Sequence, residues 1–173
     1  MATVREKRLK NEFQSVSELV ANSGASLAIV STSGNPPYQY TIEYRCRGIE
    51  RLSGNQPIFR TTHQVEISLG NHYPNSEPNA KFLTPIFHPN VWPNLKVCLG
   101  SYWTMAETIP ELIIRIGKII QYSKDVLNLD SPANGSAKNW AQNNMSRFPI
   151  DTKTFKSQID WEELPANVSF QDL

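Results

Sequence analysis

The hydrophobic pattern predicts an α+β domain with an N-terminal helix, a four-stranded antiparallel meander, a central buried helix and C-terminal helices. Apolar residues recur at helical spacing near 5–22, alternate with polar residues in short runs between 26 and 84, and return to helical spacing after 108. Brief connections between the runs favour antiparallel neighbours. The 173 residues suffice for one domain, which we expect over 1–161, with a loosely ordered tail over 162–173.

Composition and charge narrow the classes of function. Charged residues make up 19% of the chain and the formal net charge is +1, so no global field favours nucleic acid or a membrane surface. The most apolar run, 112–120, is too short and too charged to span a bilayer, and the N-terminus has no signal-peptide pattern. We expect a cytoplasmic protein, because two cysteines in unlike surroundings favour a reducing compartment.

The N-terminal helix is predicted near 5–22 from an apolar stripe that ends before Ser23-Gly24. The stripe consists of Leu9, Phe13, Val16, Leu19 and Val20. The outer face is expected to hold the basic residues Arg5, Lys7, Arg8 and Lys10. Such a cluster is either a solvated face or a partner site, and the pattern alone leaves both open.

Four strands are expected over 26–31, 38–47, 64–69 and 80–84. Alternation is strict in the second strand, so its apolar side chains share one inward face. These are Tyr38, Tyr40, Ile42, Tyr44 and Cys46. The glycine- and proline-containing segment 48–61 is predicted to be a loop with irregular edges.

The central helix is predicted to begin after Thr108, because Thr108-Ile109-Pro110-Glu111 has the pattern of a capping box. Its apolar residues surround nearly the whole helix, which indicates burial. Gly117 costs about 1 kcal/mol relative to alanine inside a helix, so close packing is expected there. Further helices are predicted after 130–134 and over 151–161. The first of these carries Ala137, Trp140, Ala141 and Asn144.

Cys98 is the candidate nucleophile. It follows His88-Pro89-Asn90 in a segment that is too interrupted by prolines and asparagines to be an ordinary core strand. Loops held on a rigid scaffold are where reactive side chains concentrate. The alternative is simple packing, since free cysteines are often buried and Val97 and Leu99 are apolar.

An ordered set of motifs resembles the ubiquitin-conjugating enzymes. The set runs Tyr73-Pro74 to Phe82, Ile86-Phe87-His88-Pro89-Asn90, Val97-Cys98-Leu99, Trp103 and Ser131-Pro132-Ala133-Asn134. The cysteine stands eight residues after the asparagine of the triplet, as it does in that family. The resemblance covers roughly residues 5–150 and implies the ubiquitin-conjugating-enzyme fold.

The resemblance implies an acyl-transfer mechanism. Cys98 would accept the C-terminal glycine of a ubiquitin-like modifier protein from the thioester on an activating enzyme. It would then pass the acyl group to an amine, usually of lysine, or to a ligase cysteine. A thiolate both attacks and leaves, which serine or threonine would not do at neutral pH. No cofactor or metal is implied: there is no phosphate-binding glycine loop and no recognised ligand spacing.

The resemblance also implies roles for other residues. Asn90 is assigned either oxyanion stabilisation or bracing of the catalytic loop. His88 is expected to pack beneath the loop and not to act as the base. Asp130 and Ser131 would flank the acceptor lysine, without the sequence deciding which dominates. A competing interpretation makes Ser131 the N-cap of the next helix, with Pro132 at its first position.

The N-terminal helix, through Arg5, Lys7 and Arg8, is expected to bind the activating enzyme. Departures from the family put ordinary docking of a RING ligase in doubt, because Asn75 follows Tyr73-Pro74 where a hydrophobic residue is usual. Further departures are Gly100 and Thr104-Met105-Ala106. These features favour a divergent member, as in bacterial conjugation cassettes that resemble ubiquitin systems.

Two other functions compete with conjugation. A catalytically silent domain of the same fold would bind a ubiquitin-like protein without reacting with it, and the presence of Cys98 argues against this. A cysteine hydrolase would pair Cys98 with His63, His72 or His88, yet no orienting Asn or Asp accompanies any of these in the usual motif context.

Overall fold

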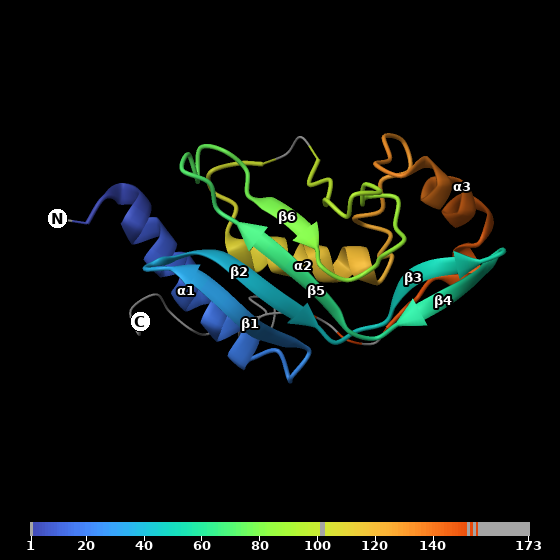
Figure 1. The fold of residues 1–173 in the computed structure, drawn as a ribbon, viewed down its shortest axis with the longest axis horizontal. Helices are drawn as coiled ribbons and strands as arrows, with labels where there is room; N and C mark the ends of the chain where they lie inside the picture. Colours follow the sequence, from blue (N-terminus) through green and yellow to red (C-terminus); the bar gives the residue numbers. More distant parts are fainter. Residues whose placement is uncertain (1, 101–102, 152, 154, 156–173) are drawn as a thin grey trace, which may run out of the picture.

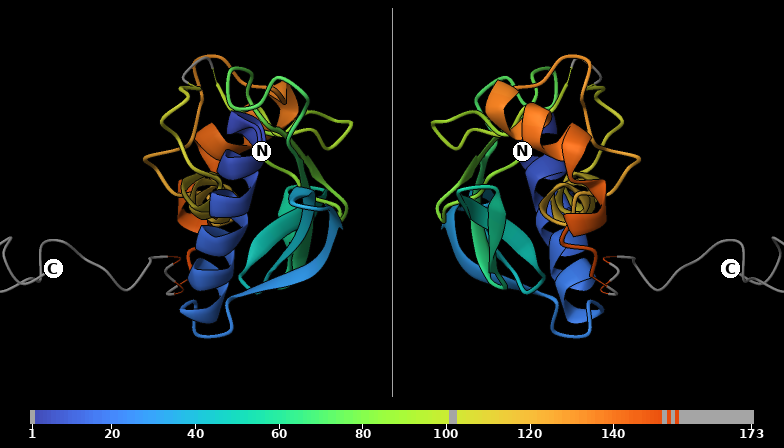
Figure 2. Two further views of the ribbon diagram at one scale, coloured as in Figure 1. Left: turned by 90° about the vertical axis from the view of Figure 1, so that its left-hand side faces the viewer. Right: turned by 90° about the vertical axis from the view of Figure 1, so that its right-hand side faces the viewer.

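The computed structural model describes residues 2–100, 103–151, 153 and 155. Two helices, α1 (Val4–Ala21) and α2 (Ile109–Ile120), cover one face of a four-stranded sheet (Figure 1, Figure 2). The sheet has the order β1-β2-β5-β6, and every neighbouring pair is antiparallel, which confirms the predicted α+β meander. Its strands are β1 Leu27–Gly34, β2 Pro37–Tyr44, β5 His63–Ser68 and β6 Asn79–Phe82.

The prediction of a loop over 48–61 is wrong, because this segment forms a second, two-stranded sheet. Strands β3 (Gly48–Ser53) and β4 (Gln56–Arg60) pair as a hairpin that extends beyond the main sheet in Figure 1. Gly54 takes a φ of +60°, which glycine adopts without a steric penalty in a two-residue turn. Gly48 admits the His63 ring, since a Cβ there would lie 2.7 Å from His63 Nε2.

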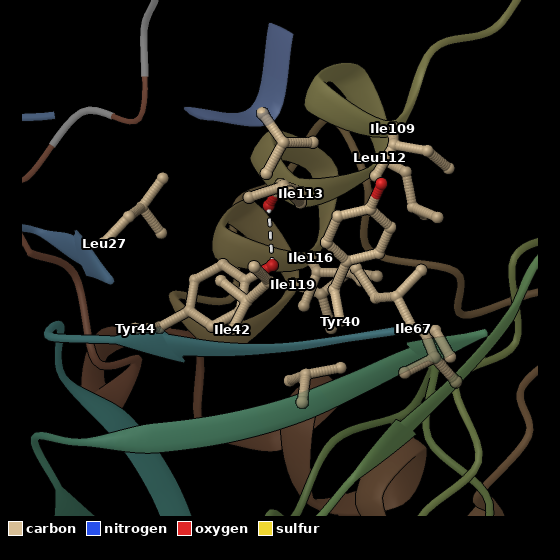
Figure 3. Packing of buried hydrophobic residues seen from close by; sticks show 14 of the residues in the cluster. Leu27, Tyr40, Ile42, Tyr44, Ile67, Ile109, Leu112, Ile113, Ile116 and Ile119 are labelled. Carbon is tan, nitrogen blue, oxygen red and sulfur yellow. Dashed lines mark hydrogen bonds between the residues drawn. The ribbon is translucent and has the colours of Figure 1, made fainter. Parts of the chain in front are cut away.

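The main core lies between the sheet and α2, as Figure 3 shows. The Tyr44 hydroxyl donates a hydrogen bond of 3.1 Å to the carbonyl of Ile113 and so joins β2 to the middle of α2. The inward stripe of β2 is confirmed except at Tyr38, which is 44% exposed. Cys46 is buried next to this strand, and burial raises the pKa of its thiol to about 12.

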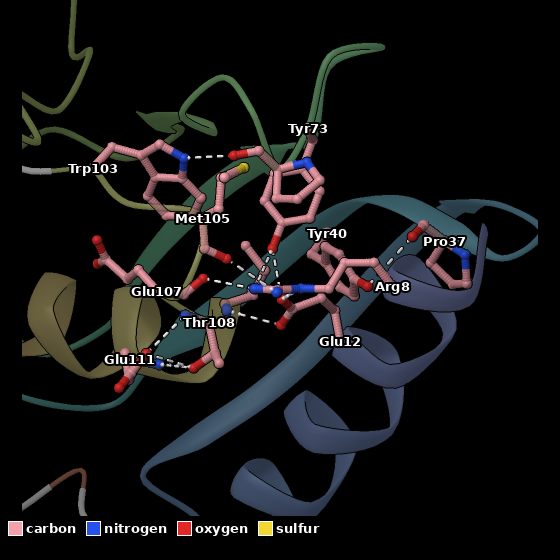
Figure 4. A network of polar contacts seen from close by, with 12 residues as sticks. Arg8, Glu12, Pro37, Tyr40, Tyr73, Trp103, Met105, Glu107, Thr108 and Glu111 are labelled. Atoms are coloured by element: carbon pink, nitrogen blue, oxygen red, sulfur yellow. Dashed lines mark hydrogen bonds and ion pairs between the residues drawn. The ribbon is translucent and has the colours of Figure 1, made fainter. Parts of the chain in front are cut away.

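Helix α2 begins as its sequence predicts, with Thr108 as N-cap in a complete capping box with Glu111. A second group also binds this helix end: the Glu12 carboxylate accepts a 2.9 Å hydrogen bond from the Ile109 backbone N–H. The same carboxylate accepts from the Tyr73 hydroxyl at 2.6 Å and from Arg8 Nε at 2.6 Å (Figure 4). A negative charge at a helix N-terminus is favourable, so Glu12 stabilises α2 from within α1.

Arg8 lies in this network and not on the outer face of α1, so its predicted placement is wrong. Its guanidinium donates to the carbonyl oxygens of Met105 and Glu107 at 3.1 and 2.8 Å. Glu12 is only 3% exposed, whereas Phe13, expected in the apolar stripe, is 37% exposed. Hydrophobic periodicity does not predict the burial of Glu12 with Arg8, because a charged side chain is buried only where distant residues form hydrogen bonds or ion pairs with it.

Helix α3 (Gly135–Asn143) packs on a second, smaller core beside the hairpin. Its N-cap is Asn134, whose Oδ1 accepts from the Ala137 N–H at 3.1 Å, so the interpretation of Ser131 as N-cap is wrong. The short 3-10 helix η1 (Met145–Arg147) follows. Asp151 is not helical, and the rest of the helix expected over 151–161 falls mainly outside the described residues, as does the expected tail over 162–173.

The close packing predicted at Gly117 is confirmed and generates a first test. A Cβ at this position would overlap the ring of the buried Phe155. We expect Gly117→Ala to lower the free energy of unfolding by about 1–3 kcal/mol, although alanine is the better helix former, because the core is overpacked. Urea denaturation followed by circular dichroism measures the change.

Gly135→Ala is the matched control, since a Cβ at Gly135 meets no atom within 4 Å. This substitution should be neutral or stabilising by up to about 1 kcal/mol. Equal stability changes for the two variants would contradict the packing explanation.

Candidate active site

His88 is a buried residue of the candidate site. Its ring is fully buried and lies edge-on against Tyr122, with the ring centroids 4.3 Å apart. The Asn90 backbone N–H donates to His88 Nδ1 at 2.9 Å, and burial lowers the pKa of His88 to about 3. The ring is therefore neutral with its proton on Nε2, so it has no free lone pair to act as a base. This geometry supports the expected packing role.

Asn90 binds the loop at 126–128 through both polar atoms of its side-chain amide. Its Nδ2 donates to the carbonyl of Val126 at 2.8 Å, and its Oδ1 accepts from the backbone N–H of Asn128 at 3.0 Å. The residue is 7% exposed. These contacts are those of a brace, and a role of Asn90 in stabilising an oxyanion stays a prediction.

Cys98 is half-buried at the end of a tight turn. Val91 and Val97 form an antiparallel bridge, and the Val97 N–H donates to the carbonyl of Ala80 in β6 at 2.9 Å. The Cys98 N–H donates to the Asn90 carbonyl at 2.8 Å, which fixes the backbone next to the sulfur. Cys98 is less buried than Cys46, and its role as the nucleophile stays a prediction.

The segment that carries Asp130 and Ser131 is attached to the same triplet. The backbone N–H groups of Ala133 and Asn134 both donate to the Pro89 carbonyl, at 2.8 and 3.0 Å. Asp130 and Ser131 are exposed. The structure thus links Cys98, Asn90 and the 128–131 turn in one hydrogen-bonded assembly.

Asn128 is a residue of this assembly that the sequence analysis did not single out. Its side chain binds the backbone of Ser131 twice, with Ser131 N–H donating to Oδ1 at 2.9 Å and Nδ2 donating to the Ser131 carbonyl at 3.0 Å. An asparagine shortly before a proline-containing turn is a recognised signal for such a contact.

The other histidines give the hydrolase interpretation no support. His63 is buried, its Nε2 lies 3.2 Å from the Arg60 carbonyl, and burial lowers its pKa to about 4. His72 is exposed in the turn that precedes Tyr73.

Within the described ranges, no group of three or more potential metal ligands is present. No helix in that part of the chain is long and apolar enough to cross a membrane.

The basic residues of α1 differ in how free they are. Arg5 donates to the carbonyl oxygens of Leu69 and Gly70 at 3.1 and 3.2 Å, and Arg8 lies in the Glu12 network. Lys7 and Lys10 are exposed. Of the three residues expected to bind the activating enzyme, Lys7 is the most accessible, and binding itself stays a prediction.

The buried, neutral His88 predicts a specific pH dependence of stability. Its folded-state pKa of about 3 lies below the ordinary value of 6.5. The stabilisation from neutral His88 is therefore complete above pH 6.5 and is lost as the pH falls from 6.5 towards 3. Between pH 7 and 5, wild type should lose about 2 kcal/mol more unfolding free energy than His88→Asn, whose Oδ1 can still accept from Asn90. Urea titrations at both pH values measure this difference.

His72→Asn serves as the control, because this exposed residue should leave the pH dependence as it is in wild type. Identical pH dependence in wild type and His88→Asn would contradict a neutral, buried His88.

Known proteins are similar in sequence to the part of the chain that holds these residues. The family model described as ubiquitin-conjugating enzyme matches residues 53–155. "Ubiquitin-conjugating enzyme E2 2" of Mycosarcoma maydis is 28% identical over 121 residues, which cover 67% of this chain and 63% of that protein. The protein of the same name from Kluyveromyces lactis is 28% identical over 116 residues, which cover 64% of this chain and 66% of that protein.

The chain therefore spans somewhat less than two thirds of the length of these relatives. A bacterial origin stays a prediction, since neither the family model nor these relatives bear on it. The family model covers more than half of the chain, including His88, Asn90, Cys98 and the 128–131 turn. This chain belongs to the ubiquitin-conjugating enzyme family.

Proposed function

We propose that this protein carries a ubiquitin-like modifier as a thioester on Cys98 and transfers it to an amine or to a ligase. The observation that carries the proposal is the placement of Cys98, half-buried and fixed through its backbone to Asn90. Cys46 provides the contrast within the same chain: its burial and raised pKa leave it unsuited to attack.

The chemistry consists of two acyl transfers without oxidation or reduction. The Cys98 thiolate attacks the carbonyl carbon of the modifier's C-terminal glycine, which is held as a thioester on the activating enzyme. The new C–S bond forms, the tetrahedral intermediate collapses, and the thiolate of the activating enzyme leaves. In the second transfer the amine nitrogen attacks, a C–N bond forms, the C–S bond breaks so that the Cys98 thiolate leaves, and the proton lost by the amine passes to solvent.

Asp130 and Ser131 are proposed to act in the second transfer. The exposed Asp130 carboxylate would orient the lysine ammonium group and ease its deprotonation. The Ser131 side chain, also exposed, would contact the same acceptor. Support comes from their hydrogen-bonded connection, through Asn128 and Asn90, to the backbone of Cys98.

The partners follow from the same proposal. The activating enzyme would dock on α1, where Lys7 is exposed and Arg5 and Arg8 are already engaged in internal contacts. A ligase would have to recognise a surface with the exposed, polar Asn75 after Tyr73-Pro74, which disfavours ordinary RING docking. The alternative function, a silent module that binds a ubiquitin-like protein, is an outcome of the test below.

Charging of Cys98 tests the proposal directly. Wild type mixed with its activating enzyme, ATP and the modifier should form an adduct that dithiothreitol removes. Cys98→Ser should form an adduct that resists the reductant, because an alkoxide is a poorer leaving group than a thiolate. Electrophoresis with and without reductant measures both adducts.

Cys46→Ala is the matched control and should charge like wild type, because the Cys46 thiol is buried. If wild type forms no adduct with genuine partners, the silent binding module is the better description. Release of the modifier without ATP would instead indicate a hydrolase.

The proposed role of Asp130 and Ser131 in the second transfer can be tested separately from charging. Asp130→Ala and Ser131→Ala should each slow discharge of the thioester to free lysine, and the double variant should lose roughly 100-fold, a loss typical of removed acid–base assistance. Single-turnover discharge of pre-charged protein gives the rate constants. Charging should be unchanged, and an equal loss in charging would mean that these residues only maintain the loop.

A further inference from the structure

We infer that Asn128 is a positioning residue that holds Asp130 and Ser131 in place for the acceptor amine. The inference rests on the proposed thioester function. It assigns to Asn128 no contact with the modifier or the acceptor, since its side-chain hydrogen bonds go to the backbone of Ser131.

The Asn128 side chain and the Ser131 backbone form two hydrogen bonds in opposite directions, which we call the clasp. One amide group supplies both an acceptor for the Ser131 N–H, at 2.9 Å, and a donor to the Ser131 carbonyl, at 3.0 Å. The two bonds fix the backbone on both sides of the Ser131 Cα, and with it the directions in which Asp130 and Ser131 project. An alanine at 128 has neither group.

The ends of the turn are held by other groups. Before the turn, Asn90 binds the Val126 carbonyl and the Asn128 backbone N–H. After it, the Pro89 carbonyl accepts from Ala133 and Asn134. All four of these bonds involve only the backbone of the 126–134 segment, so they persist when the Asn128 side chain is removed. Loss of that side chain should therefore loosen residues 129–131 and leave the Cys98 backbone unchanged.

This separation predicts which nucleophiles are affected. A lysine ammonium must be oriented and deprotonated, so it depends on where Asp130 and Ser131 lie. Hydroxylamine is largely uncharged at neutral pH and attacks the thioester without such help. A positioning defect should slow discharge to lysine and spare discharge to hydroxylamine, whereas damage to the Cys98 loop should slow both.

The experiment compares single-turnover discharge of the charged 173-residue chain to lysine and to hydroxylamine. We expect Asn128→Ala to slow discharge to lysine roughly tenfold, as the loss of one or two net hydrogen bonds would. Charging and discharge to hydroxylamine should stay within about twofold of wild type, a margin that corresponds to well under 1 kcal/mol. Asn128→Ser keeps a short hydroxyl that can close a related, weaker turn and should give an intermediate rate.

Asn94→Ala is the matched control. Asn94 Oδ1 accepts from the Lys96 N–H at 3.1 Å and so makes a local side-chain contact of the same kind outside the 126–134 segment. This variant should discharge to both nucleophiles like wild type. Combining Asn128→Ala with Asp130→Ala and Ser131→Ala should slow discharge to lysine little further, because Asn128 acts through those two residues.

Three results would overturn the inference. Equal slowing with lysine and hydroxylamine would show a general defect in the Cys98 loop. A full additional loss in the triple variant would show that Asn128 acts independently of Asp130 and Ser131. Wild-type rates for Asn128→Ala would show that the clasp is not needed. The inference fails alone in these cases, whereas absence of charging in wild type would overturn the proposed function as well.

Discussion

Pro89 and Asn90 hold together the Cys98 turn and the 126–134 segment, which are far apart in the sequence. The Pro89 carbonyl accepts two N–H groups from the entry to α3, the Asn90 carbonyl accepts from Cys98, and the Asn90 side chain grips the loop at 126–128. The buried His88 beneath them fixes the Asn90 backbone N–H. The candidate nucleophile and the turn that carries Asp130 and Ser131 therefore share one anchor, and a shift of that anchor would displace both.

A second polar centre sets the start of α2. The nearly buried Glu12 carboxylate accepts hydrogen bonds from Arg8, Tyr73 and the first residue of α2, and so its charge is compensated on three sides (Figure 4). Removal of Arg8 would leave the buried Glu12 charge without its ion-pair partner, and this costs far more stability than the loss of a surface ion pair. The network ties α1, where the activating enzyme is proposed to dock, to the segment that leads from Trp103 into α2.

The two cysteines differ in burial, which the structure shows, and the reactivity of Cys98 stays a proposal. Burial beside β2 raises the pKa of Cys46 and keeps it protonated, whereas Cys98 lies half-buried at the end of the Val91–Val97 bridge. Burial also shifts the pKa values of the two buried histidines. His63 and His88 have lowered pKa values because the core disfavours their charged forms. Neither histidine is therefore suited to deprotonate a thiol.

Local patterns by themselves determined α2 with its capping box, the alternation of β2 and β5, and the burial of Cys46 in contrast to Cys98, because each depends on residues within a few positions of one another. The ordered motifs also led to the prediction of Asn90, Asp130 and Ser131 as site residues; the structure joins them in one hydrogen-bonded assembly, and their roles stay predictions. Only the tertiary structure decided that Glu12 is buried with Arg8 as its partner, that 48–61 pairs as a hairpin, and that the Asn128 side chain binds the Ser131 backbone. Burial of a charge and the anchoring of a loop depend on partners that chain folding brings near, and spacing along the sequence does not specify those partners.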